Sequence, residues 1–412
     1  MGTTSLDKSK IKILLLEGID STAIEAFRAD GYSNIESHKT SLAGAELRAG
    51  LREAHLVGIR SRTQLPKDAL AEAERLIAIG CFCIGTDQVD TDFARERGVP
   101  VFNAPFSNTR SVAELVIGEV IMLCRGVPQR NAAAHRGTWL KSVAGAVEVR
   151  GKTLGIVGYG HIGTQVGVLA ESLGMQVLYH DIETKLGLGN AKPAATLVDL
   201  LERSDVVTLH VPDSAATVKL IGREELARMR AGSHLINASR GKVVDLDALA
   251  EAIRSGRLAG AAVDVFPREP SSNDEPFETP LSGLDNVILT PHVAGSTVEA
   301  QRSIGTEVAA KLVKYSDNGS TLTAVNFPEV SLPEHRGKHR LLHIHRNQPG
   351  VLARINGILS ESKINVASEY LETNGPIGYA VIDVDGSDRP LSLALRGQLN
   401  EVDGTIRTRI LY

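Results

Sequence analysis

A glycine-rich segment has the spacing of a phosphate-binding turn. Gly158, Gly160 and Gly163 form a G-x-G-x-x-G pattern directly after an apolar run at 154–157. The first glycine permits a tight turn, the second lets a pyrophosphate approach the backbone, and the third lets a helix pack closely on the strand. A helix after the pattern would direct free N–H groups and the positive end of its dipole toward the phosphates.

An acidic residue follows the glycines at the distance that ribose binding requires. A helix predicted at 164–173 leads to a short apolar strand at 175–179, which ends near Asp181. Dinucleotide-binding proteins place an Asp or Glu about 20 residues beyond the glycines, where it binds the ribose hydroxyls. Strand, helix and acid together predict NAD binding rather than NADP binding, since Asp181 would repel a 2′-phosphate. A plain glycine-rich turn between a strand and a helix is the alternative.

The composition is that of an ordinary globular protein. The 412 residues suggest two or three domains, and 42% of them are hydrophobic while 23% are charged. A net charge of -4 gives no indication of a nucleic-acid or membrane-surface partner. The 3 cysteines imply no disulfide framework, and the Cys81–Cys83 pair lacks nearby ligands for a metal. Without a signal-peptide core or an apolar run of about 20 residues, the protein is expected to be cytoplasmic.

Apolar runs alternate with helical patterns along most of the chain. Four such runs precede the glycine pattern, at 11–16, 55–59, 76–84 and 99–103. Alternation of this kind predicts an α/β protein with parallel sheets and helices on both faces. We therefore expect two doubly wound, Rossmann-like domains. One is a discontinuous substrate-binding domain of residues 1–108 and 296–330, and the other is an NAD-binding domain of residues 109–295.

The end of the chain has a different order of elements. A Pro- and charge-rich segment without periodicity, 331–338, is predicted to be a linker. Residues 339–412 then show the order strand, helix, strand, strand, helix, strand. This βαββαβ order predicts a separate ferredoxin-like domain.

Three further segments make the glycine pattern much more specific. They are INASRG at 236–241, DVF at 264–266 with Glu269-Pro270, and TPH at 290–292. On these segments the chain resembles the D-2-hydroxyacid dehydrogenase family, and within it the members that act on 3-phospho-D-glycerate. The resemblance covers almost the whole chain. The unit at 339–412 is similar to an ACT domain, an amino-acid-sensing module.

The resemblance implies a catalytic set of three residues. Oxidising a secondary alcohol needs a base for the hydroxyl proton, and a histidine that titrates near neutral pH can take that proton and return it. His292 matches the family's catalytic histidine, Glu269 its carboxylate partner, and Arg240 the arginine that holds the substrate carboxylate. Taken singly, each residue is also typical of a surface loop. Only their joint order after the glycine pattern favours a catalytic set.

The cofactor site implied by the resemblance extends beyond the three glycines and Asp181. Its further members lie in the turn after the second glycine and in loops after later strands: His161, Ile162, Ala238, Ser239, Arg240, Asp264, His292 and Gly295. No metal site is expected.

Substrate selection is expected to depend on the first domain. Arg60, Ser61 and Arg62 follow an apolar run, and two arginines two positions apart on an extended segment would point to the same face. Their charge suits a phosphorylated substrate, while a solvated strand edge is the alternative. The remaining candidates carry suitable charge or match family loops that contact the carboxylate: Lys39, Ile84, Gly85, Asn108 and Lys141.

The ACT-like unit suggests inhibition by L-serine. His345, Asn347 and Asn365 match the effector residues of serine-regulated relatives, and the first two can be neighbours of the third at one edge of a ferredoxin-like sheet. Capping of turns by the two asparagines is the alternative. Such sites usually form between the C-terminal units, or tails (residues 339–412), of two chains. At least a homodimer is therefore expected, and a tetramer if Trp139 makes a second interface.

These features predict NAD-dependent oxidation of 3-phospho-D-glycerate to 3-phosphohydroxypyruvate, the first step of serine biosynthesis. Reduction of 2-oxoglutarate is a side activity that the resemblance also implies. A dehydrogenase for an unphosphorylated D-2-hydroxy acid is the alternative enzyme, and Arg60 and Arg62 argue against it. An NAD-sensing co-repressor would share the fold but would need neither the Arg-Glu-His set nor an amino-acid-sensing tail.

Overall fold

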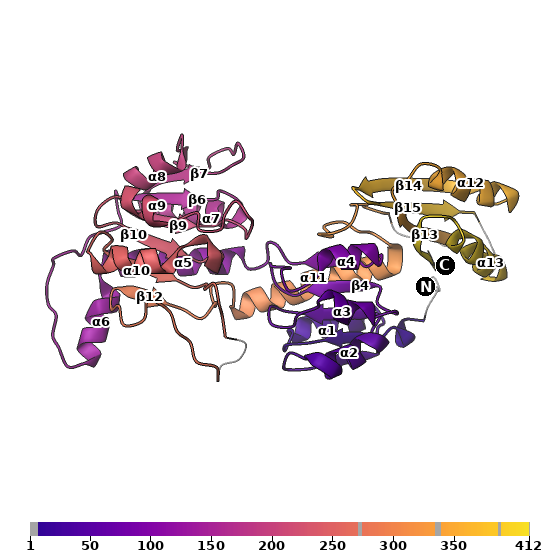
Figure 1. Ribbon diagram of the computed structural model, residues 1–412, viewed down its shortest axis with the longest axis horizontal. Helices are drawn as coiled ribbons and strands as arrows, with labels where there is room; N and C mark the ends of the chain where they lie inside the picture. Colours follow the sequence, from indigo (N-terminus) through magenta and orange to yellow (C-terminus); the bar gives the residue numbers. More distant parts are fainter. Residues whose placement is uncertain (1–6, 271–273, 334–338, 386–388, 412) are drawn as a thin grey trace. The chain divides into compact units, whose positions relative to one another are not determined.

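The computed structural model describes residues 7–270, 274–333, 339–385 and 389–411. These residues form three sheets within two compact units, Met1–Ser107 with Gln301–Tyr412 and, separately, Asn108–Ala300 (Figure 1). The boundaries predicted after 108 and after 295 lie within a few residues of these limits. The third sheet belongs to the same compact unit as the first.

The first sheet has five parallel strands in the order β2-β1-β3-β4-β5. Its strands are β1 (Ile13–Leu15), β2 (Ile35–Ser37), β3 (Leu56–Ile59), β4 (Ala78–Cys81) and β5 (Val101–Asn103). The helices around it are η1 (Lys8–Lys10), α1 (Ser21–Ala29), α2 (Gly44–Glu53), α3 (Lys67–Ala71) and α4 (Thr91–Glu96). Every residue of β1, β3, β4 and β5 is buried, as expected for a parallel sheet with both faces covered. The strand order reverses between β1 and β3, which is where such sheets bind ligands.

The second sheet has seven parallel strands in the order β12-β11-β10-β9-β6-β7-β8. The strands are β6 (Thr153–Val157), β7 (Gln176–His180), β8 (Lys192–Pro193), β9 (Val206–Leu209), β10 (His234–Asn237), β11 (Gly260–Val263) and β12 (Val287–Leu289). The helices are α5 (Thr109–Cys124), α6 (Val127–His135), α7 (His161–Ser172), α8 (Leu197–Arg203), α9 (Arg223–Arg228), η2 (Gly241–Val243) and α10 (Leu246–Arg254). Separate apolar clusters fill the two faces of this sheet. Both parallel sheets confirm the predicted doubly wound α/β class.

Helix α7 begins at His161, earlier than the predicted start at 164, and Gly160 is its N-terminal cap residue. The helix therefore begins inside the glycine pattern, and its free N–H groups lie within that pattern.

The third sheet is antiparallel, with the order β14-β15-β13-β16. The domain that contains this sheet follows the long helix α11 (Val298–Asn318). Its elements are β13 (His339–Arg346), α12 (Val351–Glu361), β14 (Val366–Asn374), β15 (Ile377–Val384), α13 (Arg389–Asn400) and β16 (Thr405–Leu411). This is the strand order of a ferredoxin-like βαββαβ domain, as predicted. Across the described ranges, no helix is both long enough and apolar enough to cross a bilayer.

Part of the predicted linker is packed rather than free. Leu332, inside the predicted linker 331–338, is 5% exposed and joins Phe327 and Val330 in an apolar cluster on the third sheet. The cluster covers the sheet face opposite its helices, which would otherwise expose apolar side chains. Residues 334–338 lie outside the described residues.

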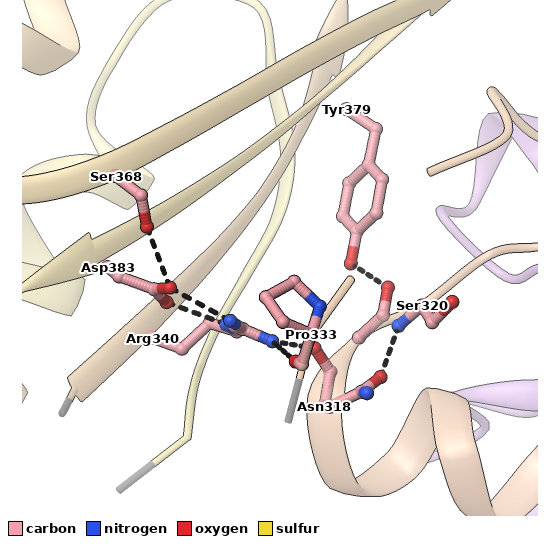
Figure 2. A network of polar contacts seen from close by, with 8 residues as sticks. Asn318, Ser320, Pro333, Arg340, Ser368, Tyr379 and Asp383 are labelled. Atoms are coloured by element: carbon pink, nitrogen blue, oxygen red, sulfur yellow. Dashed lines mark hydrogen bonds and ion pairs between the residues drawn. The ribbon is translucent and has the colours of Figure 1, made fainter. Parts of the chain in front are cut away.

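A buried ion pair joins the end of α11 to the third sheet (Figure 2). Arg340 is 1% exposed, and its Nε and Nη2 donate to the two carboxylate oxygens of Asp383 at 2.6 and 2.8 Å. Its Nη1 donates to the carbonyls of Asn318 at 3.0 Å and Pro333 at 3.2 Å. Because Asn318 ends α11, the guanidinium also compensates the negative end of that helix.

Candidate active site

The second unit brings its polar strand ends together at one edge of the sheet. The strands β10, β11 and β12 are parallel neighbours, so their carboxyl ends meet at the same edge. Arg240 follows β10, Asp264 follows β11, and His292 follows β12. Ligands of open α/β sheets bind in the crevice beyond such ends.

Asp264 organises the loop that carries His292. The residue is 1% exposed, and its Oδ1 accepts hydrogen bonds from Thr290 Oγ1 at 2.6 Å and Val293 N at 2.9 Å. Its Oδ2 accepts a third bond from Ala294 N at 3.0 Å. Its backbone carbonyl accepts from His292 N at 2.8 Å. The loop is thus fixed from both sides of the histidine.

His292 and Glu269 form the predicted pair. His292 Nδ1 lies 2.8 Å from Glu269 Oε2, and the two side chains are 47% and 36% exposed. The hydrogen bond that Glu269 accepts from the imidazole raises the pKa of His292, while burial opposes that shift. Burial alone would raise the pKa of Glu269, but His292, the Phe266 N–H and Arg240 together lower it. His292 also has a φ of 54°, a left-handed conformation that is uncommon outside glycine and clusters at functional sites.

Arg240 is held close to this pair by its backbone. Asn237, fully buried at the end of β10, donates its Nδ2 to the Arg240 carbonyl at 3.1 Å. A Cβ on Gly241 would lie 2.0 Å from the Phe266 carbonyl carbon, so only glycine allows this approach. The charge of Arg240 acts on the pKa of both Glu269 and His292. The three predicted catalytic residues are therefore in one electrostatic neighbourhood.

The glycine turn has the geometry that its pattern predicts. Gly158 has a φ of 90°, and a Cβ there would lie 2.3 Å from the His210 carbonyl oxygen. A Cβ on Gly163 would lie 2.2 Å from the Gly158 carbonyl oxygen, which explains the close packing of helix on strand. Nothing lies within 4 Å of a Cβ on Gly160, so the space over this residue is open to a ligand. These features fit a bound pyrophosphate.

Asp181 is tied directly to the glycine turn. Its Oδ2 accepts from Tyr159 N at 2.7 Å, and its Oδ1 accepts from Glu183 N at 2.9 Å. The carboxylate thus lies at the end of β7, beside the first residues of the pattern, where an acid can reach a ribose.

The other predicted cofactor residues lie along the same edge of the second unit. His161 and Ile162 open α7, and Ala238 and Ser239 directly follow β10. A Cβ on Gly295 would lie 2.2 Å from Asn108 Nδ2, so this glycine is pressed against the start of α5.

The first unit collects most of the predicted substrate residues at the carboxyl edge of its sheet. Lys39 follows β2, Arg60, Ser61 and Arg62 follow β3, and Ile84 and Gly85 follow β4. The three strands are parallel members of one sheet, in which β1 lies between β2 and β3. Residues 61 and 62 form a bend. The expectation of an extended segment is therefore wrong, because β3 ends at Ile59 and the chain bends at residues 61 and 62. That both arginines face the same side stays a prediction.

Two buried side chains that the sequence reasoning missed support these loops. Gln88 is 7% exposed and donates its Nε2 to the carbonyls of Arg60 at 2.7 Å and Gly85 at 3.3 Å. Glu17, 9% exposed at the end of β1, accepts hydrogen bonds from the backbone of the arginine loop. The only sequence signal for Glu17 was its position directly after an apolar run, and an acid at such a position also fits a surface turn.

Asn108 and Lys141 belong to the second unit, so the predicted substrate residues are divided between the two units. Lys141 lies on an exposed segment after α6. Among the described residues, no group of three His, Cys, Asp or Glu side chains could hold a metal ion.

The predicted effector residues do not come together within one chain. His345 is 4% exposed at the end of β13, which pairs with the start of β15 at Gly378. Asn365 precedes β14 and bonds Asp385 at 2.6 Å, just beyond the other end of β15. A strand rises about 3.3 Å per residue, so the ends of an eight-residue strand are roughly 23 Å apart. The expected proximity at one sheet edge is therefore wrong for a single chain, because β13 and β14 start at the same end of the sheet.

The side chains of Asn347 and Asn365 bond residues 28 and 20 positions away along the chain, so these contacts are not the local ones that turn capping predicts. Asn347 Nδ2 donates to the Gly375 carbonyl at 3.0 Å, and its backbone N donates to the Pro376 carbonyl at 2.8 Å. His345 Nδ1 lies 2.9 Å from the Arg346 carbonyl, while its buried Nε2 finds no partner among the described residues.

Comparison with known proteins defines the class. Residues 117–294 match the model of the D-isomer specific 2-hydroxyacid dehydrogenase NAD binding domain, and residues 341–407 match the AHAS small subunit-like ACT domain. D-lactate dehydrogenase from Aquifex aeolicus, solved with NAD and lactic acid, has a TM-score of 0.67 at 26% identity over 77% of this chain and 100% of its own. The second unit is accordingly an NAD-binding domain of the 2-hydroxyacid dehydrogenase type.

Full-length relatives narrow the class. The D-3-phosphoglycerate dehydrogenase of Escherichia coli (strain K12) is 59% identical over 412 residues, which is 100% of both chains. The enzyme of the same name from Dictyostelium discoideum is 51% identical over 410 residues, 100% of this chain and 99% of its own. The chain therefore belongs to the D-3-phosphoglycerate dehydrogenase family of NAD-dependent oxidoreductases.

Proposed function

We propose that the protein oxidises 3-phospho-D-glycerate to 3-phosphohydroxypyruvate with NAD, the first step of serine biosynthesis. The observation that carries the proposal is the His292–Glu269 pair at 2.8 Å beside Arg240, in an NAD-binding domain of this family. Bound NAD supplies the hydride acceptor.

His292 acts as the base in this proposal. Its Nδ1 is engaged by Glu269, so Nε2 is the nitrogen that takes the hydroxyl proton of the substrate. The carboxylate of Glu269 stabilises the imidazolium that results, as the raised pKa of His292 indicates. Arg240 binds the substrate carboxylate with its planar guanidinium and polarises the oxygen at C2.

Polar groups of the second unit would bind NAD. The N-terminus of α7, with His161 and Ile162, receives the pyrophosphate over the open backbone of Gly160. Asp181 binds the adenosine ribose and disfavours NADP. Lys185, the nearest cation along the chain, is paired with Glu183 and does not offset that preference. Equal catalytic efficiency with NADP would contradict this role of Asp181.

Arg60 and Arg62 provide selectivity for the phosphate. Both follow β3 at the switch point of the first sheet, and charge-assisted contacts contribute roughly 1.5–3 kcal/mol each. Replacing either by Ala should raise KM about 10- to 100-fold for 3-phosphohydroxypyruvate. KM for unphosphorylated hydroxypyruvate should change little. The alternative, a dehydrogenase for an unphosphorylated D-2-hydroxy acid, predicts equal effects on both. Lys39 and Lys141 are further candidates, and 2-oxoglutarate reduction remains a predicted side activity.

L-Serine is proposed to inhibit through a site built by two tails. β14 is an edge strand, and two tails joined antiparallel along their β14 edges would share a two-fold axis. This pairing would bring Asn365 of one tail to the end of the sheet that carries His345 and Asn347 of the other. The separation of these residues within one chain is thus what a dimeric effector site requires.

A second interface is proposed around Trp139. Its side chain is 86% exposed and that of Val143 is 90% exposed, and both lie on the segment between α6 and β6. Exposed aromatic and apolar side chains of this kind mark association surfaces. Two interfaces together would give a homotetramer. A cytoplasmic location, expected from the sequence, stays a prediction.

One assay tests the proposed function. NADH formation should be measured with 3-phospho-D-glycerate against a panel of unphosphorylated D-2-hydroxy acids, with and without L-serine. A marked preference for the phosphorylated substrate, with inhibition by serine, is expected. A preference for an unphosphorylated acid would contradict the proposal. Asn347→Ala should keep the activity and lose the serine response, and full inhibition of that variant would place the serine site elsewhere.

A further inference from the structure

Glu17 is buried beside the loop that carries the proposed phosphate-binding arginines. Its Oε1 accepts hydrogen bonds from Arg60 N at 3.1 Å and from Thr63 N at 2.8 Å. Its Oε2 accepts a third from Arg62 N at 2.9 Å. All three donors are backbone N–H groups, so a single carboxylate fixes the path of the chain from residue 60 to residue 63. Hydrogen bonds of this kind to an ionised acceptor are among the stronger ones in proteins.

The backbone of the same turn also holds the neighbouring loop. Glu17 N donates to the Thr40 carbonyl at 3.0 Å, and Gly18 N donates to the His38 carbonyl at 2.9 Å. These two bonds flank Lys39, another candidate for the phosphate. The turn after β1 therefore joins the ends of β1, β2 and β3 at the switch point of the sheet, where open α/β sheets bind ligands.

The backbone of Glu17 is in an unfavourable conformation for a residue with a side chain. Its φ is 67°, and Gly18 follows with a φ of 61°. Glycine adopts the left-handed region freely, whereas other L-residues do so at a cost. The turn alone would be made more easily by a glycine, so the turn does not explain the glutamate. Strained residues of this kind persist where the surrounding structure holds them, and they cluster at functional sites.

We propose that Glu17 is a positioning residue for phosphate recognition. Its carboxylate fixes the backbone of the loop at 60–63, so that the guanidinium groups of Arg60 and Arg62 are presented to the substrate phosphate. The inference rests on the proposed function, because it needs a phosphorylated substrate. Repulsion between Glu17 and that phosphate is limited because the carboxylate is buried and faces three backbone N–H groups.

Glu17→Gln tests the carboxylate with the smallest change in shape. A glutamine keeps one acceptor oxygen but places an NH₂ group where Oε2 accepts from Arg62 N, so two donors would face each other. We expect KM for 3-phosphohydroxypyruvate to rise about tenfold, the loss typical of one charge-assisted hydrogen bond. KM for hydroxypyruvate, KM for NADH and both kcat values should stay within about twofold, since Glu17 does not touch the reacting atoms.

A second variant separates positioning from folding. Glu17→Gly removes the carboxylate and at the same time relieves the left-handed φ of 67°, so the turn itself is not weakened by strain. It should show the same selective rise in KM. The matched control is Glu53→Gln, which removes an exposed carboxylate from the same unit where it pairs with Lys12 at 2.6 Å. The control should leave the ratio of the two KM values unchanged.

Arg60→Ala and Arg62→Ala, measured alongside, tell apart the two ways in which the inference can fail. If the arginine variants lose phosphate selectivity and both Glu17 variants keep it, Glu17 only stabilises the turn and the inference is wrong. If the arginine variants affect both substrates alike, the phosphate assignment itself is wrong, and the inference falls with it. A selective rise in KM for the phosphorylated substrate in the arginine and Glu17 variants, without a change in the control, would support it.

Discussion

The carboxylates of Asp264 in the second unit and Glu17 in the first each accept three hydrogen bonds from a loop that carries candidate site residues. Both follow a buried strand of a parallel sheet, and both are largely buried. They differ in where the strained residue lies. In the second unit it is His292, the side chain that is delivered, with a φ of 54°. In the first unit it is Glu17, the acceptor itself, with a φ of 67°.

This difference corresponds to the demands of the two tasks. Proton transfer needs one ring nitrogen at a defined place and angle, so the constraint falls on the backbone of His292. Phosphate binding by arginine draws on a long side chain with several donors, so it is enough to anchor the backbone from which Arg60 and Arg62 project. Damage to the Asp264 loop should therefore appear in kcat, and damage to the Glu17 loop in KM.

Replacement of His292 should have the largest effect. His292→Asn removes the base while leaving the glycine turn and Asp181 intact, so NADH binding should be retained. General acid-base groups contribute about 10²–10⁴-fold, and kcat should fall by that amount. Steady-state kinetics with a fluorescence titration of NADH checks both parts. A fall of less than tenfold would mean that another group takes the proton.

Asp264→Asn should have the next largest effect. The amide keeps one oxygen but turns an NH₂ group toward one side of the loop, where Val293 N or Ala294 N now donates. We expect kcat to fall about 10- to 100-fold, as for supporting residues around other reactive centres. The selectivity between phosphorylated and unphosphorylated substrates should not change. A selective loss of the phosphorylated substrate would remove the contrast between the two loops.

Glu269→Gln should change the pH dependence of oxidation. Glu269 raises the pKa of His292, so its removal lowers that pKa. The base must be neutral to accept the proton, and the acid limb of the kcat/KM profile should therefore move to lower pH. The profile should be recorded with 3-phospho-D-glycerate across pH 5 to 9. An unmoved limb would show that the pair does not control the proton transfer.

Glu119, a further buried acid, is expected to affect stability rather than catalysis. Glu119 on α5 is 1% exposed, and neither carboxylate oxygen has a hydrogen-bond partner among the described residues. Burial, together with the charge of Asp264, raises the pKa of Glu119 to about 8. Asp264 and Glu17 differ from Glu119 in that their carboxylates accept hydrogen bonds from several donors. Glu119 should be neutral in the folded protein at pH 7.

Glu119→Gln should therefore change the pH dependence of stability. The folded-state pKa of Glu119 lies above the unfolded value of about 4.3. The contribution of Glu119 to the free energy of unfolding is therefore fully present below about pH 4.3 and is lost as the pH rises to about 8. The loss is at most about 1.4 kcal/mol per pH unit. Glutamine does not titrate, so the Tm of the variant relative to the parent should increase between pH 5 and 8. A constant difference in Tm would show that Glu119 does not titrate in this range.

Features that depend on local sequence could be predicted. The glycine turn, Asp181 and the strand-helix alternation each extend over a few tens of residues, and the structure places them as the patterns indicated. The order of elements after 339 was sufficient to predict the third sheet, because the βαββαβ connection admits few arrangements.

Features that depend on contacts between distant strands could not be predicted. Glu17 reaches Arg60 across 43 positions, and only the parallel pairing of β1 with β3 brings them together. The bend at 61 and 62 and the packing of Leu332 likewise follow from tertiary contacts. The separation of Asn365 from His345, in contrast, follows from the shared direction of β13 and β14, which the predicted βαββαβ order already implies.

The most direct test of the division between the two loops is one ratio. It is kcat/KM for 3-phosphohydroxypyruvate divided by kcat/KM for hydroxypyruvate, measured with NADH for the parent, Arg62→Ala and Asp264→Asn. We predict that Arg62→Ala lowers the ratio about 10- to 100-fold, while Asp264→Asn lowers both terms equally and keeps the ratio. A ratio that falls in Asp264→Asn, or that survives Arg62→Ala, would contradict the assignment of chemistry to one loop and phosphate selectivity to the other.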